Sequence, residues 1–462
     1  MRNKFQKVGL VMTGVFAGVL ISLNFSASAD KVAPAPLPVE ELRAFADVFN
    51  AIKQGYVEPV EDKTLINHAI GGMLNGLDPH SSYLDAEAFK ELQVGTHGEF
   101  GGLGIEVGME DGFVKVISPI EDTPAFRSGV KAGDLIVKLD ETPVKGMSLN
   151  DAVKRMRGKP KTDITLTIVR KGEDRPLVLT LTREVIKVQS VKSKVVEPGY
   201  GYLRVAQFQE NTAQSVVEHL GKLAKEGELK GLVLDLRNDP GGLLHGAVGV
   251  ASAFLAPNSL IVSTDGRTED AKREYRAVSE DYLRGNRDDF LKTLPAGARS
   301  LPMVVLVNAG SASASEIVAG ALQDHKRAVV MGTQTFGKGS VQTILPLNSS
   351  TAIKLTTARY YTPNGRSIQA KGIEPDILVE ETTNGSSRRL READLERHLG
   401  NDRDPDVERL KAVEPKSGTK PASDDDDSAA TVRFELAGKD DYQLNQAINL
   451  LKGLQIVQNK KE

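Results

Sequence analysis

The sequence predicts a multi-domain α/β protein whose largest domain is built on a mainly parallel sheet. Two short apolar runs, residues 232–236 and 303–307, are each followed by a glycine-containing turn and then by a helix-forming stretch. Strands that alternate with helices are typical of a parallel sheet, because a parallel connection needs a crossover segment. Apolar side chains at helical spacing near both ends of the chain predict further helices outside this sheet.

The chain of 462 residues is long enough for several domains. Shifts in composition along it separate six segments. In order, we expect an export signal (1–29), a helical region (30–94), a strand-rich domain (95–184), a catalytic core (185–380), a polar linker (381–432) and a C-terminal helix (433–462).

The first 29 residues have the pattern of an export signal. Three basic residues precede an apolar stretch from Val8 to Phe25, and Ala27-Ser-Ala29 has the small residues of a cleavage site. An uncleaved membrane anchor is the alternative, because 18 apolar residues nearly span a bilayer. Either interpretation places the remaining chain outside the cytoplasm, and we expect the periplasm.

The bulk composition excludes several classes of site. A net charge of −3 gives no electrostatic footprint for nucleic acid. Without cysteine there can be no disulfide or thiolate chemistry, and the seven histidines show no metal-binding spacing, so we expect neither metal nor cofactor. His325 ends the helix that begins near Ser313, about 18 Å away, and is therefore too far to act as its base.

Residues 40–93 are expected to be mainly helical. Apolar side chains recur there at helical spacing, and Asp78-Pro-His-Ser-Ser-Tyr83 interrupts them as a turn. Such apolar stripes, here and in the C-terminal helix, support pairing of the chain with another copy, because one domain cannot bury them.

The strand-rich segment 95–184 contains Gly101-Gly-Leu-Gly-Ile105 before a strand, and Ala132-Gly-Asp-Leu-Ile136 further on. In this register the segment resembles a PDZ domain over nearly its full length. The resemblance implies that a loop made of Gly102, Leu103, Gly104 and Ile105 holds the terminal carboxylate of a peptide. The adjoining strand edge would pair with the peptide backbone, and glycine allows the close approach.

The catalytic core carries three serines in the turn after strand 303–307, namely Ser311, Ser313 and Ser315. A serine at a helix N-terminus lies where unpaired N–H groups and the helix dipole favour negative charge. Chemistry alone leaves the choice among them open and gives Ser313 a slight preference. The polar stretch 280–299 before this strand is expected to be an inserted surface loop, with a lid as the alternative.

A single lysine, Lys338, follows in a glycine-flanked loop, and serine with lysine is a known way to form a nucleophile. Lys338 acts as general base only when neutral, so its pKa must fall from about 10.4 through burial. If the segment is extended, Gln342 lies on the same face as Lys338 and could hold the lysine amine in line with the serine. The oxyanion needs backbone donors, which we expect from Ala314 and from Gly241 or Gly242.

Residues 40–380 closely resemble the carboxyl-terminal processing peptidases, the tail-specific family of exported serine proteases. The matching segments are 76–84, the PDZ-like stretch, 234–242, 311–324, 336–342 and 361–365. The resemblance implies that Ser313 is the nucleophile, Lys338 its base and Gln342 the residue that orients the lysine. It also implies a catalytic fold like that of crotonase and the Clp peptidase, with the PDZ domain inserted.

The expected function is therefore cleavage of exported proteins that end in apolar tails. The resemblance further suggests an adaptor lipoprotein and a homo-oligomer as partners. Two alternatives remain: a PDZ-based scaffold with an inactive catalytic domain, and a crotonase-type acyl-CoA enzyme. Ser313 and Lys338 are both present, which opposes the first, and the export signal opposes the second.

Overall fold

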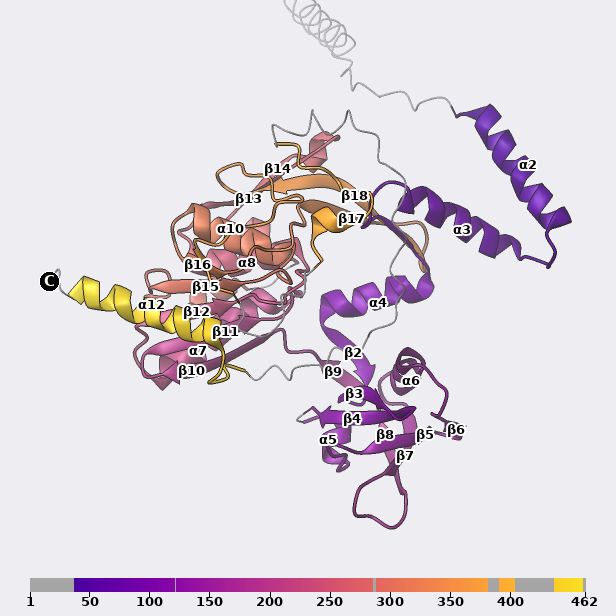
Figure 1. The fold of residues 1–462 in the computed structure, drawn as a ribbon, viewed down its shortest axis with the longest axis horizontal. Helices are drawn as coiled ribbons and strands as arrows, with labels where there is room; N and C mark the ends of the chain where they lie inside the picture. The colour runs from indigo at the N-terminus through magenta and orange to yellow at the C-terminus, as the bar shows by residue number, and fades with distance from the viewer. Residues whose placement is uncertain (1–36, 121, 286–287, 381–389, 404–435, 460–462) are drawn as a thin grey trace, which may run out of the picture. The chain divides into compact units, whose positions relative to one another are not determined.

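A computed structural model describes residues 37–120, 122–285, 288–380, 390–403 and 436–459 (Figure 1). The expected export signal lies outside these residues, as does most of the expected linker. The chain divides into two compact units, residues 1–68 and 69–462. In the described part of the chain, no helix has the length and apolar character needed to cross a membrane.

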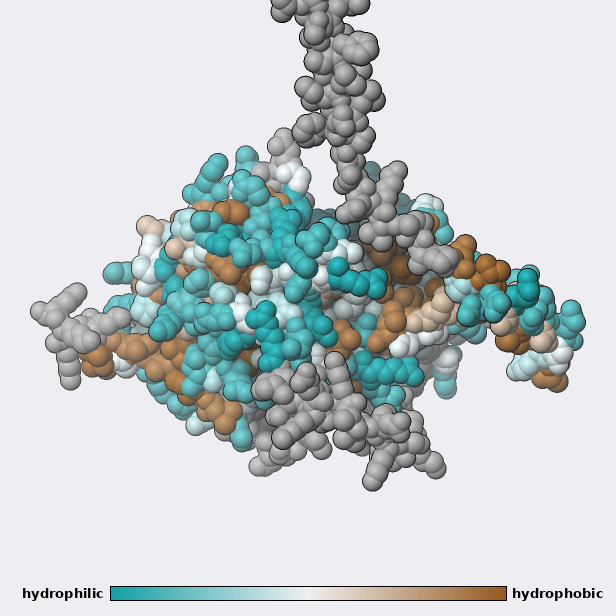
Figure 2. Space-filling view, turned by 90° about the horizontal axis from the view of Figure 1, so that it is seen from above, coloured by the Kyte–Doolittle hydropathy of each residue, from teal (hydrophilic) through white to brown (hydrophobic). Residues whose placement is uncertain are grey.

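The first unit contains α2 (Val39–Gly55) and the start of α3 (Asp62–Asn75). Glu40 and Glu41 in the first turn of α2 and Lys53 in the last complement the helix dipole. None of its residues is buried, and its apolar side chains are exposed. Figure 2 shows apolar surface among the polar side chains of α2, at the right of the view. The helical reading of this region is confirmed for the described residues.

The strand-rich segment folds as expected into a small sheet with the order β3-β4-β5-β7-β8. Its strands are Ile105–Glu110, Phe113–Pro119, Leu135–Leu139, Asp163–Val169 and Leu177–Thr182, and β6 (Thr142–Pro143) pairs with β5. The helices are α5 (Pro124–Arg127) and α6 (Leu149–Met156). Ser148 caps α6 by accepting a hydrogen bond from the Asp151 N–H.

The segment is attached through a two-stranded pair, β2 (Glu99–Gly102) with β9 (Glu184–Lys187), so the chain enters and leaves the domain side by side. Upstream, α4 (Ala86–His97) is capped by Asp85 and ends at Gly98, whose φ of 72° suits glycine.

The core sheet has the order β10-β11-β12-β15-β16-β19, and all of its neighbouring strands are parallel except β10 and β11. Its strands are Val191–Glu197, Tyr200–Val205, Gly231–Asp235, Met303–Val307, Val329–Gly332 and Ile377–Leu378. The predicted runs 232–236 and 303–307 thus pair directly as β12 and β15.

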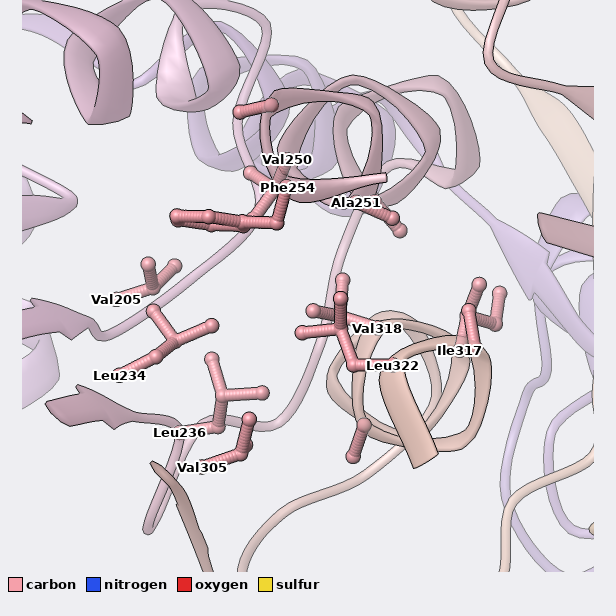
Figure 3. Packing of buried hydrophobic residues seen from close by; sticks show 14 of the residues in the cluster. Val205, Leu234, Leu236, Val250, Ala251, Phe254, Val305, Ile317, Val318 and Leu322 are labelled. Carbon is pink, nitrogen blue, oxygen red and sulfur yellow. The ribbon is translucent and has the colours of Figure 1, made fainter. Parts of the chain in front are cut away.

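Helices cover both faces of this sheet. Helices α7 (Thr212–Glu226), α8 (Leu244–Phe254) and α10 (Ala314–Asp324) pack on one face. Figure 3 shows Leu234 and Val305 pointing toward Phe254 and Val318 across it. Alternate residues such as Val233 and Val304 contact α12 (Tyr442–Asn459) on the other face. Most of the apolar stripe of this helix is therefore buried within the domain, and the expectation that one domain cannot bury it is wrong for the C-terminal helix. Burial on both sides explains why these strands are continuously apolar.

A second, antiparallel sheet has the order β1-β18-β13-β14, with β17 also paired to β18. Its strands are Ser82–Leu84, Ala352–Tyr361, Leu260–Gly266, Arg273–Arg276 and Ser340–Pro346. Strand β1 lies in the segment expected to be helical, and its three residues are too few to show a period of two. This sheet carries the segment that follows Lys338.

Two polar segments are better packed than their composition suggests. The stretch 280–299 includes the end of α9 (Ser279–Tyr282) and η2 (Phe290–Thr293), and the Tyr282 and Phe290 rings lie 5.3 Å apart. Tyr282 is buried in the core cluster, so the described part of the segment 280–299 is packed against the core and is not a free lid. Within the expected linker 381–432, residues 390–403 contain η3 (Glu392–Asp394), and Glu392 is fully buried.

Candidate active site

Two loops meet at the carboxyl edge of the core sheet, because β12 and β15 are adjacent and parallel. The Asn238 N–H donates to Asn308 Oδ1 at 2.9 Å, and Asn308 Nδ2 donates back to Asn238 Oδ1 at 3.0 Å. The Ala312 N–H donates to the Asp239 carbonyl at 2.9 Å. These bonds hold the loop after β12 against the turn that contains the three serines.

The three serines differ in what their hydroxyl groups do. Ser311 and Ser315 are fully buried, and they donate to the Leu236 and Asp239 carbonyls at 2.7 and 3.0 Å. Ser313 between them is only partly buried. Its φ of 56° and ψ of −112° are unusual for a residue with a side chain, and such backbone strain is typical of functional turns. This geometry favours Ser313 among the three serines, and its role as the nucleophile stays a prediction.

Glu316 joins the serine turn to the lysine loop. This fully buried carboxyl accepts hydrogen bonds from the N–H groups of Ser313, Gly337 and Lys338 at 2.7, 2.7 and 3.0 Å. The Thr335 hydroxyl adds a fourth at 2.5 Å. Burial raises the pKa of Glu316 to about 7, while these hydrogen bonds act in the opposite direction. Sequence reasoning missed this residue, although a glutamate three positions after a helix cap is a capping-box signal.

Lys338 is partly buried, and its backbone N–H donates to the same oxygen of Glu316, Oε2, as the Ser313 N–H. Burial lowers the pKa of its amine and the positive charge of Lys354 adds to that effect, whereas Glu392, Glu316 and Asp78 oppose it. A lowered pKa of the Lys338 amine is what a general base requires. The Tyr360 hydroxyl donates to the Lys338 carbonyl and also contacts the Ser313 side chain. Both residues are described, and no hydrogen bond joins the Lys338 amine to the Ser313 hydroxyl.

Gln342 faces a different set of partners from the one expected. Its Nε2 donates to the Ser340 hydroxyl at 3.0 Å, to the Ser340 carbonyl at 3.3 Å and to the Thr356 hydroxyl at 3.4 Å. None of the hydrogen bonds between described residues links it to Lys338. Gln342 does lie on β17, which begins two residues after the lysine, so its role in orienting the amine stays a prediction.

A turn from the N-terminal part of the chain supports this region. Asp78 accepts hydrogen bonds from the Ser81 hydroxyl at 2.7 Å and from the Thr356 hydroxyl at 3.1 Å. His80 Nε2 lies 2.8 Å from Glu392 Oε2, and Glu392 also accepts from Gln369 at 2.8 Å. Asp78-Pro-His-Ser-Ser was expected to form a turn, but its proximity to Thr356 and Glu392 depends on contacts across roughly 300 residues.

Of the expected oxyanion donors, Ala314 follows Ser313 in the chain, Gly241 packs against the Ser313 turn, and Gly242 packs against Phe208. A side chain on Gly241 would come within 2.9 Å of the Ala314 nitrogen, and one on Gly242 within 2.1 Å of the Phe208 carbonyl oxygen. Both positions therefore need glycine. The Gly241 N–H already donates to Asp239 Oδ1 at 2.8 Å. The N–H groups of Ala314 and Gly242 have no hydrogen-bond partner among the described residues, so they are the donors that remain available.

The predicted carboxylate loop has the geometry of a peptide-binding edge. Gly104 has a φ of 76°, and an added Cβ would lie 2.2 Å from Thr123. Strand β3, which begins at Ile105, pairs only with β4 among the described strands, so its other backbone edge is open. Gly102, Leu103 and Gly104 of this loop are buried. Such an edge can accept an extended peptide as an additional strand.

No group of three or more histidine or acidic side chains suited to a metal ion occurs in the described ranges. The predicted site residues offer a serine hydroxyl, a lysine amine and backbone amides. These groups can form and stabilise a covalent acyl intermediate.

Models of known families match three parts of the chain. Residues 199–379 match the model of peptidase family S41, and residues 101–181 match that of the PDZ domain. Residues 21–88 match the N-terminal domain of the activating protease CtpB.

Among similar proteins, the carboxy-terminal-processing protease of Bartonella bacilliformis is 45% identical over 446 residues, covering 95% of this chain and 94% of that protein. The carboxy-terminal processing protease CtpB of Bacillus subtilis is 33% identical, covering 80% and 75%. Among solved structures, the photosystem II D1 C-terminal processing protease is 31% identical, with a TM-score of 0.41, and the match covers 74% of this chain and 93% of that one.

Proposed function

This chain belongs to peptidase family S41 as a carboxy-terminal processing protease, a serine peptidase with a PDZ domain, and we propose that it cleaves exported proteins with a Ser313–Lys338 dyad. The observation that carries this proposal is the convergence of both residues on Glu316. One buried carboxyl fixes the backbone of the strained serine and the backbone of the lysine.

In the proposed reaction the neutral Lys338 amine takes the proton of the Ser313 hydroxyl as its oxygen attacks the substrate carbonyl. The N–H groups of Ala314 and Gly242 stabilise the oxyanion. Lys338 then gives its proton to the leaving amine, and a water molecule hydrolyses the acyl-enzyme by the same route. Before attack, the Lys338 amine must move to the Ser313 hydroxyl, and Gln342 is the residue we propose to hold it there.

We propose that the substrates are proteins with apolar C-terminal tails. The open edge of β3 and the loop Gly102–Ile105 would bind the tail, and the N-terminal export pattern supports a periplasmic location. An adaptor lipoprotein remains a proposed partner. Homo-oligomer formation is supported by the exposed apolar side chains of α2, among them Leu42, Phe45 and Val48.

The test compares the full chain with Ser313→Ala and Lys338→Ala on an exported protein that ends in a short apolar tail. We expect each variant to lose at least about a thousandfold in kcat/KM, because neither residue works without the other. Ser349→Ala and Lys292→Ala, at exposed positions, are matched controls and should keep full activity. Cleavage that survives Ser313→Ala would assign the nucleophile elsewhere. A wild-type protein that binds the tail but never cuts would favour the scaffold alternative.

A further inference from the structure

Asp239 is a buried carboxyl beside the proposed oxyanion site that the mechanism above does not use. Asp239 is fully buried and lies in the loop between β12 and α8. Oδ1 accepts the Gly241 N–H at 2.8 Å, and Oδ2 has no hydrogen-bond partner within the described part of the chain. A carboxyl oxygen left unpaired in the interior is costly when the group is charged. The arrangement therefore fits a protonated carboxyl better than an ionised one.

The same residue is bonded to both sides of the nucleophile. Its carbonyl accepts the Ala312 N–H at 2.9 Å and the Ser315 hydroxyl at 3.0 Å. Gly241, whose amide the side chain holds, is packed so closely that an added Cβ would lie 2.8 Å from Ser313 Cβ. Asp239 thus acts on the site through Gly241 and through the turn around Ser313, which makes it a positioning residue.

The charged groups that act on the Asp239 carboxyl include residues of β11 and β12. Burial raises its pKa to about 7, while the hydrogen bond from the Gly241 N–H, the nearby Ser315 hydroxyl and the charge of Arg204 on β11 act in the opposite direction. Asp235 on β12 adds to the rise, although Arg204 and Arg237 lie against it at 3.4 and 2.7 Å. On α10, Glu316 directs both oxygens to the serine turn and the lysine loop. Asp239 can therefore change charge near neutral pH.

We propose that Asp239 controls the oxyanion site through its proton, so that the protonated carboxyl supports catalysis and the carboxylate opposes it. This inference rests on the proposed Ser–Lys peptidase function. A negative charge in this buried loop repels the oxyanion that forms beside Ala314 and Gly242, and repulsion is strong where water is excluded. The carboxylate also binds the Gly241 N–H more tightly, because hydrogen bonds to charged acceptors are stronger.

The test is the pH dependence of kcat/KM for the wild type and Asp239→Asn between pH 5.5 and 9. Asparagine has nearly the same shape, keeps the acceptor for Gly241 and cannot ionise. The titration of Lys338 is common to both proteins and cancels in their ratio. We expect the ratio of Asp239→Asn to wild type to be nearly constant below pH 6 and to rise about tenfold or more by pH 9. A ratio that stays constant over the whole range, whatever its value, would mean a purely structural role.

A second measurement reads the proton without activity. In the Ser313→Ala background, the free energy of unfolding is followed against pH with and without Asp239→Asn. A carboxyl whose pKa is raised in the folded state loses stability as pH rises from its unfolded value of 3.8 to about 7, and then levels off. Over that pH range we expect the free energy of unfolding of the chain that retains Asp239 to fall relative to that of the Asp239→Asn chain.

Parallel stability curves would overturn the inference. A constant activity ratio in an active enzyme overturns it too and leaves the proposed function intact. A wild-type protein inactive at every pH overturns the proposed function, and with it this inference.

Discussion

Glu316 is the residue on which the geometry of the site depends most. Its carboxylate is the acceptor in all four of its hydrogen bonds, and three of the donors are backbone N–H groups, which cannot rotate away. In Glu316→Gln an amide NH₂ would face at least one of these donors and leave it unpaired. We expect a loss of about 1–3 kcal/mol in the free energy of unfolding, measured by urea denaturation. We also expect kcat to fall more than KM changes, because the dyad is displaced while tail binding is untouched.

Glu228→Gln is the control for this substitution, since Glu228 is exposed and the same chemical change is made there. Its stability and kcat should match those of the wild type. If Glu316→Gln behaved like Glu228→Gln, the carboxyl would not be what holds the serine turn and the lysine loop together.

Residues of the site could be predicted where the signal is local. Ser313 and Lys338 stand out through the turns that contain them, although the three serines are separated only by burial and backbone geometry. Glu392 and Asp78 could not be found in this way, because each is brought to the site by a distant segment. The expected partner of Gln342 differs for a similar reason, since Thr356 on the neighbouring strand supplies an acceptor that spacing along β17 does not reveal.

At the level of elements, α12 is fixed to the core by a buried ion-pair network as well as by its apolar face. Arg237 donates to both oxygens of Asp441 at 2.9 and 2.6 Å and to Gln443 at 2.9 Å, while its other side contacts Asp235. Asp441→Ala removes one of the two carboxylates and leaves Asp235. We expect a loss of about 2 kcal/mol in the free energy of unfolding, as is usual for hydrogen bonds between charged groups.

The neighbouring Asp440 is exposed, so Asp440→Ala in the same urea titration is the matched control and should change stability by less than about 0.5 kcal/mol. Equal effects of the two substitutions would show that the apolar stripe alone holds α12 in place.

Elements with a strong apolar signal were predicted well, and short or charged ones were not. Strands β12 and β15 agree with the expected runs 232–236 and 303–307 to within a residue, and α8 and α10 follow them where helices were expected. Strand β1 has three residues and takes its place only through pairing with β18. Residues 390–403 are polar in composition, yet the carboxyl of Glu392 is paired with Gln369 and His80, so burial there depends on partners that composition does not show.

For the molecule as a whole, we assign the selection of substrates to the PDZ domain and cleavage of the peptide bond to the catalytic core. A substitution that alters selection should therefore leave the cleavage chemistry unchanged. Gly104→Ala places a methyl group 2.2 Å from Thr123 at a φ of 76°, and it should distort the loop that receives the tail carboxylate. We expect the preference for an apolar-tailed protein over its charged-tailed counterpart to fall toward one. The measurement is the ratio of kcat/KM for the two substrates, with tail affinity measured separately by titration of a tail peptide.

Gly221→Ala on α7 is the control for that experiment, because its added Cβ would meet nothing within 4 Å and its φ is not positive. This variant should keep the wild-type preference. If Gly104→Ala also kept it, the tail would be recognised outside the loop Gly102–Ile105. If Gly104→Ala abolished cleavage of both substrates equally, an occupied PDZ domain would be needed for the chemistry itself, and selection and catalysis would be coupled in the intact chain.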